Sequence, residues 1–587
     1  MTIDDRDFVI LWSRTLQAMF EREADNLAEL DRRVGDGDHG ETMRRAFTAA
    51  RIAVEEAARA DTNESDVSAG DLLLIQGRAI LDAGGGASGP LMASLFVQLG
   101  QAVKARGALD AVAFGEGLLG AVDLVQRMGR TSPGDKTLLD AMEPAARSVK
   151  QLSERHEVGL RDAWGAASQA AQTGRDATAE MQGRRGRAAW VEGKGEGTPD
   201  PGATSFAWIL SAGLSLFEKA DRAYERDVPI QQGQSPPLYM VQVDSPASDA
   251  PRPAPPGKLL NDPSNAVDEM IDGFALAFPE RVRRIEGTTI VARAKRSTDS
   301  KVGLVIGNGS GHEPIAMGWV GQGMLDANAV GPIFTAPSPN LLAHAVAEAD
   351  GGSGVLLLVS HHEGDRISSE MAAELARVEG HEVETLLMYD DVASAPKGRE
   401  PERRGGAGTT FIYKIVGQAL EEGMSLADAK ALGERIRDAT RTLSVALASG
   451  TSPISGATMF SLPAGEAFIG MGVHGEPGFA RVAATSVDEI VTKVVNGLLD
   501  DADYPPGAPL LAVINGSGGT SLMELLVATR AVVHQAALRG HEVRHPLIGS
   551  YVTTQETKGF SVSFFHPTDQ DDVRRWMAPA DVPFFHL

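Results

Sequence analysis

The stretch VGDGDHGETM, residues 34–43, lies between two long segments with the periodicity of helices and packs three glycines, two aspartates and a histidine into residues 35–40. Gly and Asp tolerate the backbone angles of tight turns, so an ordinary surface turn is one interpretation. Asp31 lies just upstream, and the resulting pattern D-x4-D-x-D-H-G can bring Asp31, Asp36 and Asp38 to one small volume. The residues flanking this stretch therefore predict helices joined by a functional loop.

Three carboxylates held together without a cation would repel one another and partly protonate. Magnesium is the hard cation that would neutralise them while keeping coordination positions open for phosphate oxygens. A calcium loop of the EF-hand type needs a Glu six residues past its glycine, and this stretch does not have that register. The pattern therefore favours magnesium.

Length and composition set the broad class. The chain has 587 residues, which is too long for one hydrophobic core and predicts several domains. No apolar run approaches the roughly 18 residues that span a bilayer. The first residues, MTIDDRDFVILW, are acidic and lack the features of a signal peptide, so we expect a cytoplasmic protein without membrane association.

Charge and cysteine content exclude several functions. The sequence contains no cysteine, which excludes disulfides, thiol nucleophiles and Cys-ligated zinc. The formal net charge of -24 would repel nucleic acid, and no long basic run counters it. A polyphosphate ligand would need metal ions or backbone amides aimed at it.

The organisation along the chain predicts a multidomain protein. Residues 1–225 show apolar residues at helical spacing, which indicates an all-α domain. Residues 226–257 contain eight prolines and are typical of an extended linker. From residue 258 to residue 587, short apolar runs alternate with Gly-rich turns and helical segments, which indicates an α/β domain. Polar loops follow four of these runs, and we expect those loops to converge.

Further Gly-rich loops interrupt the helical domain. They read DAGGGASG, RTSPGDKT and DPGATS, and the first runs directly into a helix whose N-terminus can bind an anion. A flexible connection between helices is the alternative for any one of them. The chain lacks the pattern G-x-x-x-x-G-K-[ST], so a nucleotide site here is not of the P-loop type.

Taken together, GDGDHG, GGGASG, PGDKTLLDA and DPGATS resemble, in order, the motifs of the nucleotide-binding domain of the dihydroxyacetone kinase family. The resemblance implies a helical barrel that holds ATP, with Asp31, Asp36 and Asp38 binding two Mg²⁺ ions. It implies nucleotide contacts at His39, Thr42, Gly85, Ala87, Ser88, Gly129, Lys136, Thr137, Asp200 and Gly202. Lys136 stands where the family usually has Arg. Lys keeps the positive charge but lacks the planar guanidinium group that can donate two parallel hydrogen bonds.

The second half resembles the substrate-binding domain of the same family through GSGHEP, EGDR, DDVA, GAGT and GMGVHGEPG. The resemblance implies two α/β subdomains, a homodimer through these domains, and covalent capture of a ketone on His474. It implies that His312 and Asp365 handle the hydroxyl that is phosphorylated, with Gly309, Ser310 and Gly311 lining the substrate. An imidazole nitrogen adding to a ketone gives a hemiaminal, which a polyol without a carbonyl cannot form.

The chain also departs from the family. It reads SHHEGD where the family reads close to NYTGD, so His361, His362 and Glu363 become candidate substrate contacts, and Asn308 stands where a Gly is usual. Extra polar groups favour a ketose with an extra hydroxyl, so we expect a four-carbon ketose such as erythrulose to be preferred over dihydroxyacetone. A zinc site at these residues and Asp365 is disfavoured, because adjacent side chains on an extended segment point to opposite faces.

The prediction is an ATP-dependent kinase acting on the terminal hydroxyl of a short ketose, with the nucleotide domain preceding the substrate domain. One alternative is a ketose phosphotransferase that keeps ADP bound and is recharged by a phosphocarrier protein. Such systems divide the two domains between separate chains, so the fusion favours ATP. The other alternative is a ketose-sensing regulator, which would have no need of three magnesium-binding carboxylates.

Overall fold

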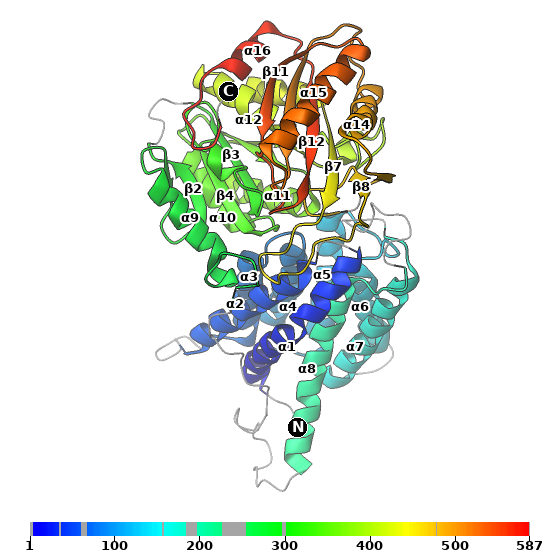
Figure 1. Ribbon diagram of the computed structural model, residues 1–587. Helices are drawn as coiled ribbons and strands as arrows, with labels where there is room; N and C mark the ends of the chain where they lie inside the picture. Colours follow the sequence, from blue (N-terminus) through cyan, green and yellow to red (C-terminus); the bar gives the residue numbers. More distant parts are fainter. Residues whose placement is uncertain are drawn as a thin grey trace. The chain divides into compact units, whose positions relative to one another are not determined.

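The computed structural model describes residues 4–34, 37–59, 67–154, 158–183, 196–225, 254–295, 301–476 and 478–585. The chain divides into two compact units, residues 1–250 and 251–587 (Figure 1). Most of the predicted linker, residues 226–253, lies outside the described residues. Within the described parts, no helix combines the length and the apolar character that crossing a membrane requires.

The first unit is built from helices alone in its described residues, as the sequence predicts. The helices are α1 (Asp5–Val34), α2 (His39–Arg59), α3 (Ala69–Gly84), α4 (Ser88–Arg106), α5 (Ala111–Gly129), α6 (Leu139–Ser153), α7 (Leu160–Ala177) and α8 (Pro201–Glu225). Each helix packs against the next, and α8 returns to α1, so the helices close into a barrel. The quoted stretch at residues 34–43 links α1 to α2.

Aromatic side chains fill the interior of the barrel. Phe114 stacks on Trp164 with 4.3 Å between ring centroids, and Trp12 meets Trp164 edge to face at 5.0 Å. The indole N–H groups of Trp12 and Trp164 donate to the carbonyls of Ile209 and Leu210 in α8, so these buried donors are satisfied. The packed interior gives the loops at the helix ends a rigid support.

The second unit begins with a six-stranded sheet of order β1-β2-β4-β3-β5-β6. The strands are β1 (Val282–Arg284), β2 (Ile290–Arg293), β3 (Gly303–Ser310), β4 (Ala327–Ile333), β5 (Val355–Val359) and β6 (Val383–Leu387). Strands β4, β3, β5 and β6 are neighbours in this order and run parallel to one another. Helices α10 (Pro339–Ala349) and α11 (Glu363–Val378) cover one face, and α9 (Ala266–Ala277), α12 (Thr409–Glu421) and α13 (Leu426–Asp438) cover the other. Burial on both faces explains the continuous apolar runs of β3 and β5.

A second six-stranded sheet has the order β11-β10-β12-β7-β8-β9 and is mostly antiparallel. Its strands are β7 (Thr440–Ala448), β8 (Glu466–Ile469), β9 (Ala480–Ala483), β10 (Leu510–Gly516), β11 (Val543–Gly549) and β12 (Lys558–Phe565). Helices α14 (Val487–Asp501) and α15 (Leu522–Leu538) cover one face. The other face shares a hydrophobic core with the first sheet, to which α16 (Gln570–Met577) contributes Trp576. The α/β prediction with two subdomains is confirmed.

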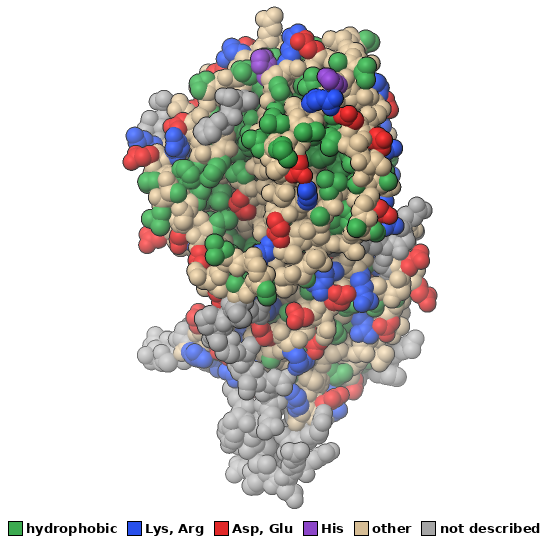
Figure 2. Space-filling view, viewed as in Figure 1, with side chains coloured by type: hydrophobic (Ala, Val, Ile, Leu, Met, Phe, Trp, Pro, Cys, Tyr) green, Lys and Arg blue, Asp and Glu red, His purple; other side chains and the backbone are tan. Residues whose placement is uncertain are grey.

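The outer face of α15 is apolar. Leu522, Met523, Leu526 and Val527 are between 46% and 73% exposed. Figure 2 shows hydrophobic side chains gathered on this face of the α/β unit, where α15 runs in Figure 1. An apolar surface of this kind is typical of a contact with another protein surface.

Candidate functional site

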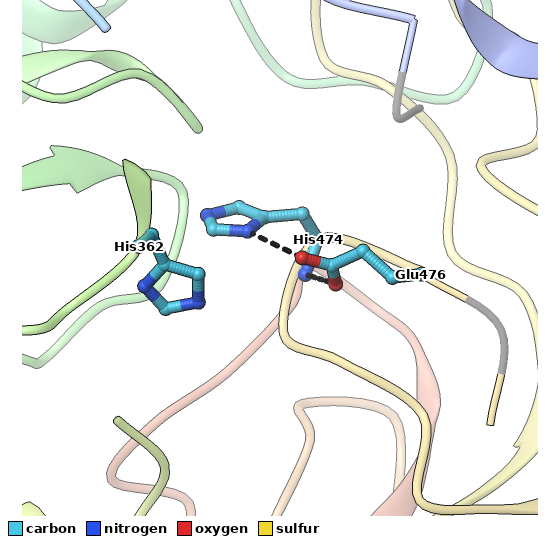
Figure 3. A group of neighbouring side chains, drawn as sticks. All are labelled: His362, His474 and Glu476. Carbon is cyan, nitrogen blue, oxygen red and sulfur yellow. Dashed lines mark hydrogen bonds and ion pairs between the residues drawn. The ribbon is translucent and has the colours of Figure 1, made fainter. Parts of the chain in front are cut away.

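Three histidine side chains meet inside the α/β unit, although they come from widely separated parts of the sequence. His312 follows β3, His362 follows β5, and His474 lies in the loop after β8. The ring centroid of His474 is 4.9 Å from that of His312 and 4.8 Å from that of His362. Figure 3 shows His362 facing His474 across the space between their two loops. The structure therefore brings together the two predicted catalytic histidines and one histidine of the SHHEGD stretch.

Glu476 fixes the orientation of His474. Its carboxylate accepts the backbone N–H of His474 at 3.0 Å and lies 3.2 Å from the imidazole Nδ1 (Figure 3). A carboxylate accepts and cannot donate, so Nδ1 carries the proton and the lone pair of a neutral ring is on Nε2. Gly472 is needed for this arrangement, because a Cβ there would lie 2.0 Å from Oε2 of Glu476.

His312 is held by a different partner. Its Nδ1 donates to the carbonyl of Thr553 at 2.7 Å, which leaves the lone pair on Nε2. Among the described residues this buried Nε2 has no hydrogen-bond partner. Burial lowers the pKa of His312 to about 4, so the ring is neutral at physiological pH and can accept a proton at Nε2.

Asp365 lies in the first turn of α11, and its Oδ2 is 3.4 Å from Nδ1 of His362. Nε2 of His362 is buried and, among the described residues, has no hydrogen-bond partner. The adjacent His361 turns the other way and donates from Nδ1 to the carbonyl of Arg403 at 2.6 Å. Glu363 forms an ion pair with Arg366 at 2.6 Å. Of the three predicted contacts at 361–363, only His362 faces His474.

The GSG stretch at the end of β3 brings the backbone close to the neighbouring loop. A Cβ at Gly309 would lie 2.6 Å from the nitrogen of Thr335, and a Cβ at Gly311 would lie 2.6 Å from the ring of Phe334. Between them, the buried hydroxyl of Ser310 has no hydrogen-bond partner among the described residues.

Three neighbours of the histidines were not predicted from the sequence. They are Glu476, Thr553 and Phe334, whose ring centroid is 5.0 Å from that of His312. Glu476 could have been found, since it stands two positions after His474 in the motif GVHGEPG. Thr553 acts through its backbone carbonyl and Phe334 through packing, so neither carries a signal in the sequence.

A cavity of about 40 Å³ is lined in part by Gly472 and Val473 of the His474 loop and by Arg404, Asn515 and Thr554. A volume of this size has room for ordered water. Arg404 pairs with Asp391 at 2.8 Å and lies 3.6 Å from Glu476. The cavity therefore belongs to the polar support of the histidine cluster.

In the helical unit, His39 connects three of the four predicted motif loops. Its Nδ1 lies 3.1 Å from the hydroxyl of Ser88, and its Nε2 lies 3.0 Å from the hydroxyl of Ser205. Burial lowers the pKa of His39, so the ring is neutral. The fourth loop joins through Lys136, whose ammonium donates to the carbonyls of Thr198 at 2.9 Å and Met181 at 3.2 Å. The predicted nucleotide loops thus converge, with Lys136 holding backbone carbonyls.

Asp31 and Asp38 border the loop between α1 and α2. One oxygen of Asp31 accepts the backbone N–H groups of Gly37 at 2.8 Å and His39 at 3.3 Å. Asp38 directly precedes α2, and the predicted metal ligand Asp36 lies outside the described residues. The carboxylate of Asp31 therefore shapes the loop that carries the other two.

Further carboxylates lie near Asp31. Burial, opposed by a hydrogen bond from the N–H of Ala203 and reinforced by the charges of Asp140 and Asp31, raises the pKa of Asp200 to about 7. Asp140 accepts the N–H groups of Gly134 at 2.5 Å and Thr137 at 2.7 Å. A divalent cation would relieve the repulsion among these groups, so the residues present fit magnesium.

The remaining predicted nucleotide contacts stand at helix ends. Gly85 follows α3 with a φ of +66°, Ala87 precedes α4, and Gly129 ends α5. Arg45 holds this turn by donating to the carbonyls of Ala83 at 2.6 Å and Gly84 at 2.7 Å. Thr42 lies in the first turn of α2, and Gly202 lies in the first turn of α8. Of these residues, Ala87, Thr42 and Gly202 stand at helix N-terminal ends, where the helix dipole favours an anion.

The helical barrel with its acidic loop and the α/β unit with its histidine cluster define a protein of the Dak class. Residues 33–215 match the model of the DAK2 domain, and residues 272–584, more than half of the chain, match that of the Dak1 domain. The chain belongs to the dihydroxyacetone kinase family, with the DAK2 domain first.

Relatives with assigned names support the same family. The dihydroxyacetone-binding subunit DhaK of the PTS-dependent dihydroxyacetone kinase 1 of Listeria innocua is 37% identical over 55% of this chain and 98% of its own length. The L-erythrulose kinase of Pectobacterium atrosepticum and the D-erythrulose kinase of Mycolicibacterium smegmatis are each 36% identical over 56% of this chain and 56% of their own lengths.

Two solved structures are similar to part of the chain. The dihydroxyacetone kinase of C. freundii in complex with AMP-PNP and Mg²⁺ has a TM-score of 0.51 and 31% identity over 56% of this chain and 60% of its own. The dihydroxyacetone kinase operon co-activator Dha-DhaQ has a TM-score of 0.52 and 29% identity over 54% of this chain and 97% of its own. The similar proteins thus include both a kinase and a regulator.

Proposed function

We propose that this chain is an ATP-dependent kinase that phosphorylates the terminal hydroxyl of a short ketose held covalently on His474. The observation that carries the proposal is the pairing of His474 with Glu476, with Nδ1 to Oε1 at 3.2 Å, close to Nε2 of His312, which has no hydrogen-bond partner in the described part of the chain. One imidazole is thereby prepared as a nucleophile and the other as a proton acceptor.

Capture follows from the tautomer of His474. Nε2 adds its lone pair to the carbonyl carbon, the carbonyl π bond breaks, and the oxygen takes up a proton as the imidazole nitrogen returns to neutrality. Glu476 holds the proton of Nδ1 before the addition, stabilises the positive charge that the ring carries during it, and then takes that proton so that the ring returns to neutrality. Ketones are selected because a polyol offers no carbon that can accept the nitrogen lone pair.

His312 then serves the hydroxyl of the captured ketose. Its neutral Nε2 can take the hydroxyl proton as the oxygen attacks the phosphoryl group. Asp365 faces His362, at 3.4 Å between Oδ2 and Nδ1, and its negative charge also favours a proton on the nearby His312. We assign Asp365 the role of stabilising the protonated state of this histidine cluster.

The helical unit supplies the phosphoryl donor. Asp31, Asp36 and Asp38 would hold two Mg²⁺ ions, and the loops joined by His39 would hold the nucleotide. When bound, Mg²⁺-ATP supplies the γ-phosphoryl group and the cationic charge that offsets its oxygens. A fit to this ligand is supported by the raised pKa of Asp200 and by the structure of a similar kinase with AMP-PNP and Mg²⁺. An ATP-consuming enzyme of this kind would work in the cytoplasm.

We infer that the ketose has four carbons. His362 adds a hydrogen-bonding nitrogen beside His474, and its buried Nε2 lacks a partner among the described residues. An extra hydroxyl on the ketose would satisfy it, whereas dihydroxyacetone would leave it unpaired. The names of two relatives, an L- and a D-erythrulose kinase, agree with this inference.

A homodimer through the α/β units is part of the proposal. The exposed apolar side chains of α15 offer a surface that a second copy could cover with its own α15. Light scattering should give twice the chain mass for the wild type and the monomer mass for a variant with Met523→Glu and Leu526→Glu. A dimer that survives both substitutions would exclude this surface.

The test of the function uses purified chain, ATP, Mg²⁺ and a panel of C3 to C6 ketoses, with ADP release as the readout. We expect ADP release that depends on the ketose. Capture is tested separately by ¹³C NMR with a ketose labelled at its carbonyl carbon and wild-type protein in the presence of a metal chelator. The carbonyl signal should be replaced by that of a tetrahedral carbon. Capture without ATP turnover would favour the ketose-sensing alternative, and turnover that requires a phosphocarrier protein would favour the phosphotransferase.

A further inference from the structure

His362, His474 and Glu476 form a compact group of side chains in the α/β unit that are of the types that bind metal ions (Figure 3). Each offers one ligand atom, and these atoms lie within 4.8 Å of one another. His474 and Glu476 are buried, and His362 is largely buried. We propose that these three residues bind a divalent ion of the zinc type and that a bound ion prevents His474 from capturing a ketose.

The spacing of the ligands suits such an ion. Around tetrahedral zinc with bonds of about 2.0–2.1 Å, neighbouring ligand atoms are roughly 3.3 Å apart. Nδ1 of His474 and Oε1 of Glu476 already lie 3.2 Å apart. His362 is on a different loop. A rotation of its side chain that moves the ligating ring nitrogen by roughly 1–2 Å would bring the three ligand atoms to the spacing found around tetrahedral zinc.

The ligand types select the metal. Two imidazoles and one carboxylate suit zinc, cobalt, nickel or copper, and magnesium prefers oxygen ligands in octahedral geometry. The carboxylates Asp365 and Asp391 lie nearby, and Arg404 is the adjacent cation. The guanidinium of Arg404 lies 2.8 Å from Asp391 and 3.6 Å from Glu476.

Exclusion of the ketose follows from the lone pairs of one imidazole ring. If the metal binds Nε2 of His474, it takes the lone pair that would add to the carbonyl carbon. If it binds Nδ1, the ring proton moves to Nε2, and that nitrogen then has no lone pair to donate. The neutral ring has one such pair, so metal and ketose compete. This second part of the inference rests on the proposed function of His474, whereas the metal site itself does not.

The test is a titration of the full chain with Co²⁺ in excess Mg²⁺, which fills the carboxylate site of the helical unit. Tetrahedral Co²⁺ absorbs strongly in the visible range, so binding is measured without any assay of activity. The matched pair is His362→Asn and His361→Asn. Asn is a favourable residue at the helix N-cap that His362 occupies, and it tolerates the φ of +59° at His361.

We expect His362→Asn to weaken Co²⁺ binding by roughly 100-fold, since losing a ligand should cost at least as much as losing one of its hydrogen-bonding supports. His361→Asn should bind as the wild type does. Equal affinity in the two variants would overturn the site. X-ray absorption of the zinc-loaded wild type should show imidazole ligands, and a coordination shell of oxygen alone would overturn it without any variant.

Competition is tested by repeating the Co²⁺ titration with erythrulose or dihydroxyacetone and no ATP. The apparent dissociation constant should rise in proportion to ketose concentration. An unchanged constant, in protein that captures the ketose when chelator is present, would overturn the exclusion. If the chelated protein captures no ketose, the proposed function of His474 fails while the Co²⁺ result for His362→Asn still decides the metal site.

Discussion

The candidate site of the helical unit is rich in oxygen ligands, and that of the α/β unit is rich in imidazole nitrogens. In the first site the charges of Asp31 and Asp140 both act on Asp200, and in the second site three histidine rings meet. Oxygen ligands suit a hard cation and the phosphates it carries, whereas imidazoles suit a carbonyl carbon or a softer metal. Each unit therefore offers the groups that one half of the proposed transfer reaction requires.

Burial acts in opposite directions on the two sites. It raises the pKa of Asp200 to about 7, which favours the protonated carboxyl, and it lowers the pKa of His312 to about 4, which favours the neutral ring. Both effects disfavour the charged form. In the helical unit a bound cation would favour the negatively charged carboxylate of Asp200. In the α/β unit the neutral ring of His312 is the form that can accept a proton.

The strongest way to separate the two sites is His474→Ala. We expect loss of ketose capture and a fall in ketose-dependent turnover of up to about 10⁶-fold, the order seen when a nucleophile is removed. ATP binding, measured by calorimetry, should be unchanged because the substitution lies in the other unit. Covalent capture by the variant would contradict the assignment of His474.

The helical unit is tested by two separate substitutions of predicted magnesium ligands, Asp38→Asn and Asp36→Asn. Each should lower phosphoryl transfer by roughly 10²–10³-fold, because a lost carboxylate weakens the charge stabilisation at the phosphates. Ketose capture followed by ¹³C signals should persist in both variants. Near wild-type turnover at ordinary Mg²⁺ concentrations would remove the metal assignment.

The choice of ketose sharpens the role of His362. We expect kcat/KM for one erythrulose enantiomer to exceed that for dihydroxyacetone by roughly 10- to 100-fold, the value of one buried hydrogen bond of about 1–3 kcal/mol. His362→Asn should reduce this ratio more than His361→Asn does. A tenfold preference for dihydroxyacetone in the wild type would overturn the inference.

The smallest predicted effect is on how the free energy of unfolding varies with pH, measured in the presence of a metal chelator. Folded Asp200 binds more protons than its unfolded form between about pH 3.8 and 7, so its contribution to the free energy of unfolding falls as pH rises through that window. His312 has the reverse sign between about pH 4 and 6.5, because its unfolded form binds more protons. Each slope is at most about 1.4 kcal/mol per pH unit.

Urea unfolding at pH 5, 6 and 7 checks these slopes. Relative to the wild type, Asp200→Asn should make stability rise more steeply with pH, and His312→Asn should make it rise less steeply. Parallel curves for all three proteins would show that neither group is shifted as described.

The fold was largely predictable from the sequence because its patterns are local. Helical periodicity in residues 1–225 and buried apolar runs such as those of β3 and β5 report which faces must be covered. The mostly antiparallel second sheet was not predicted, since pairing between strands depends on partners far apart in the chain. The sequence also predicted that loops after four strands carry the chemistry.

Within the site, the sequence by itself determined which residue types are present: the aspartates of GDGDHG and the histidines of GSGHEP, SHHEGD and GVHGEPG. Only the tertiary structure decided that His362 faces His474 while His361 bonds to the carbonyl of Arg403. The two adjacent side chains diverge because the backbone turns at His361, where φ is +59° and lies in the left-handed region. Which of the two reaches the site depends on how β5 packs in its sheet, and no local pattern encodes that.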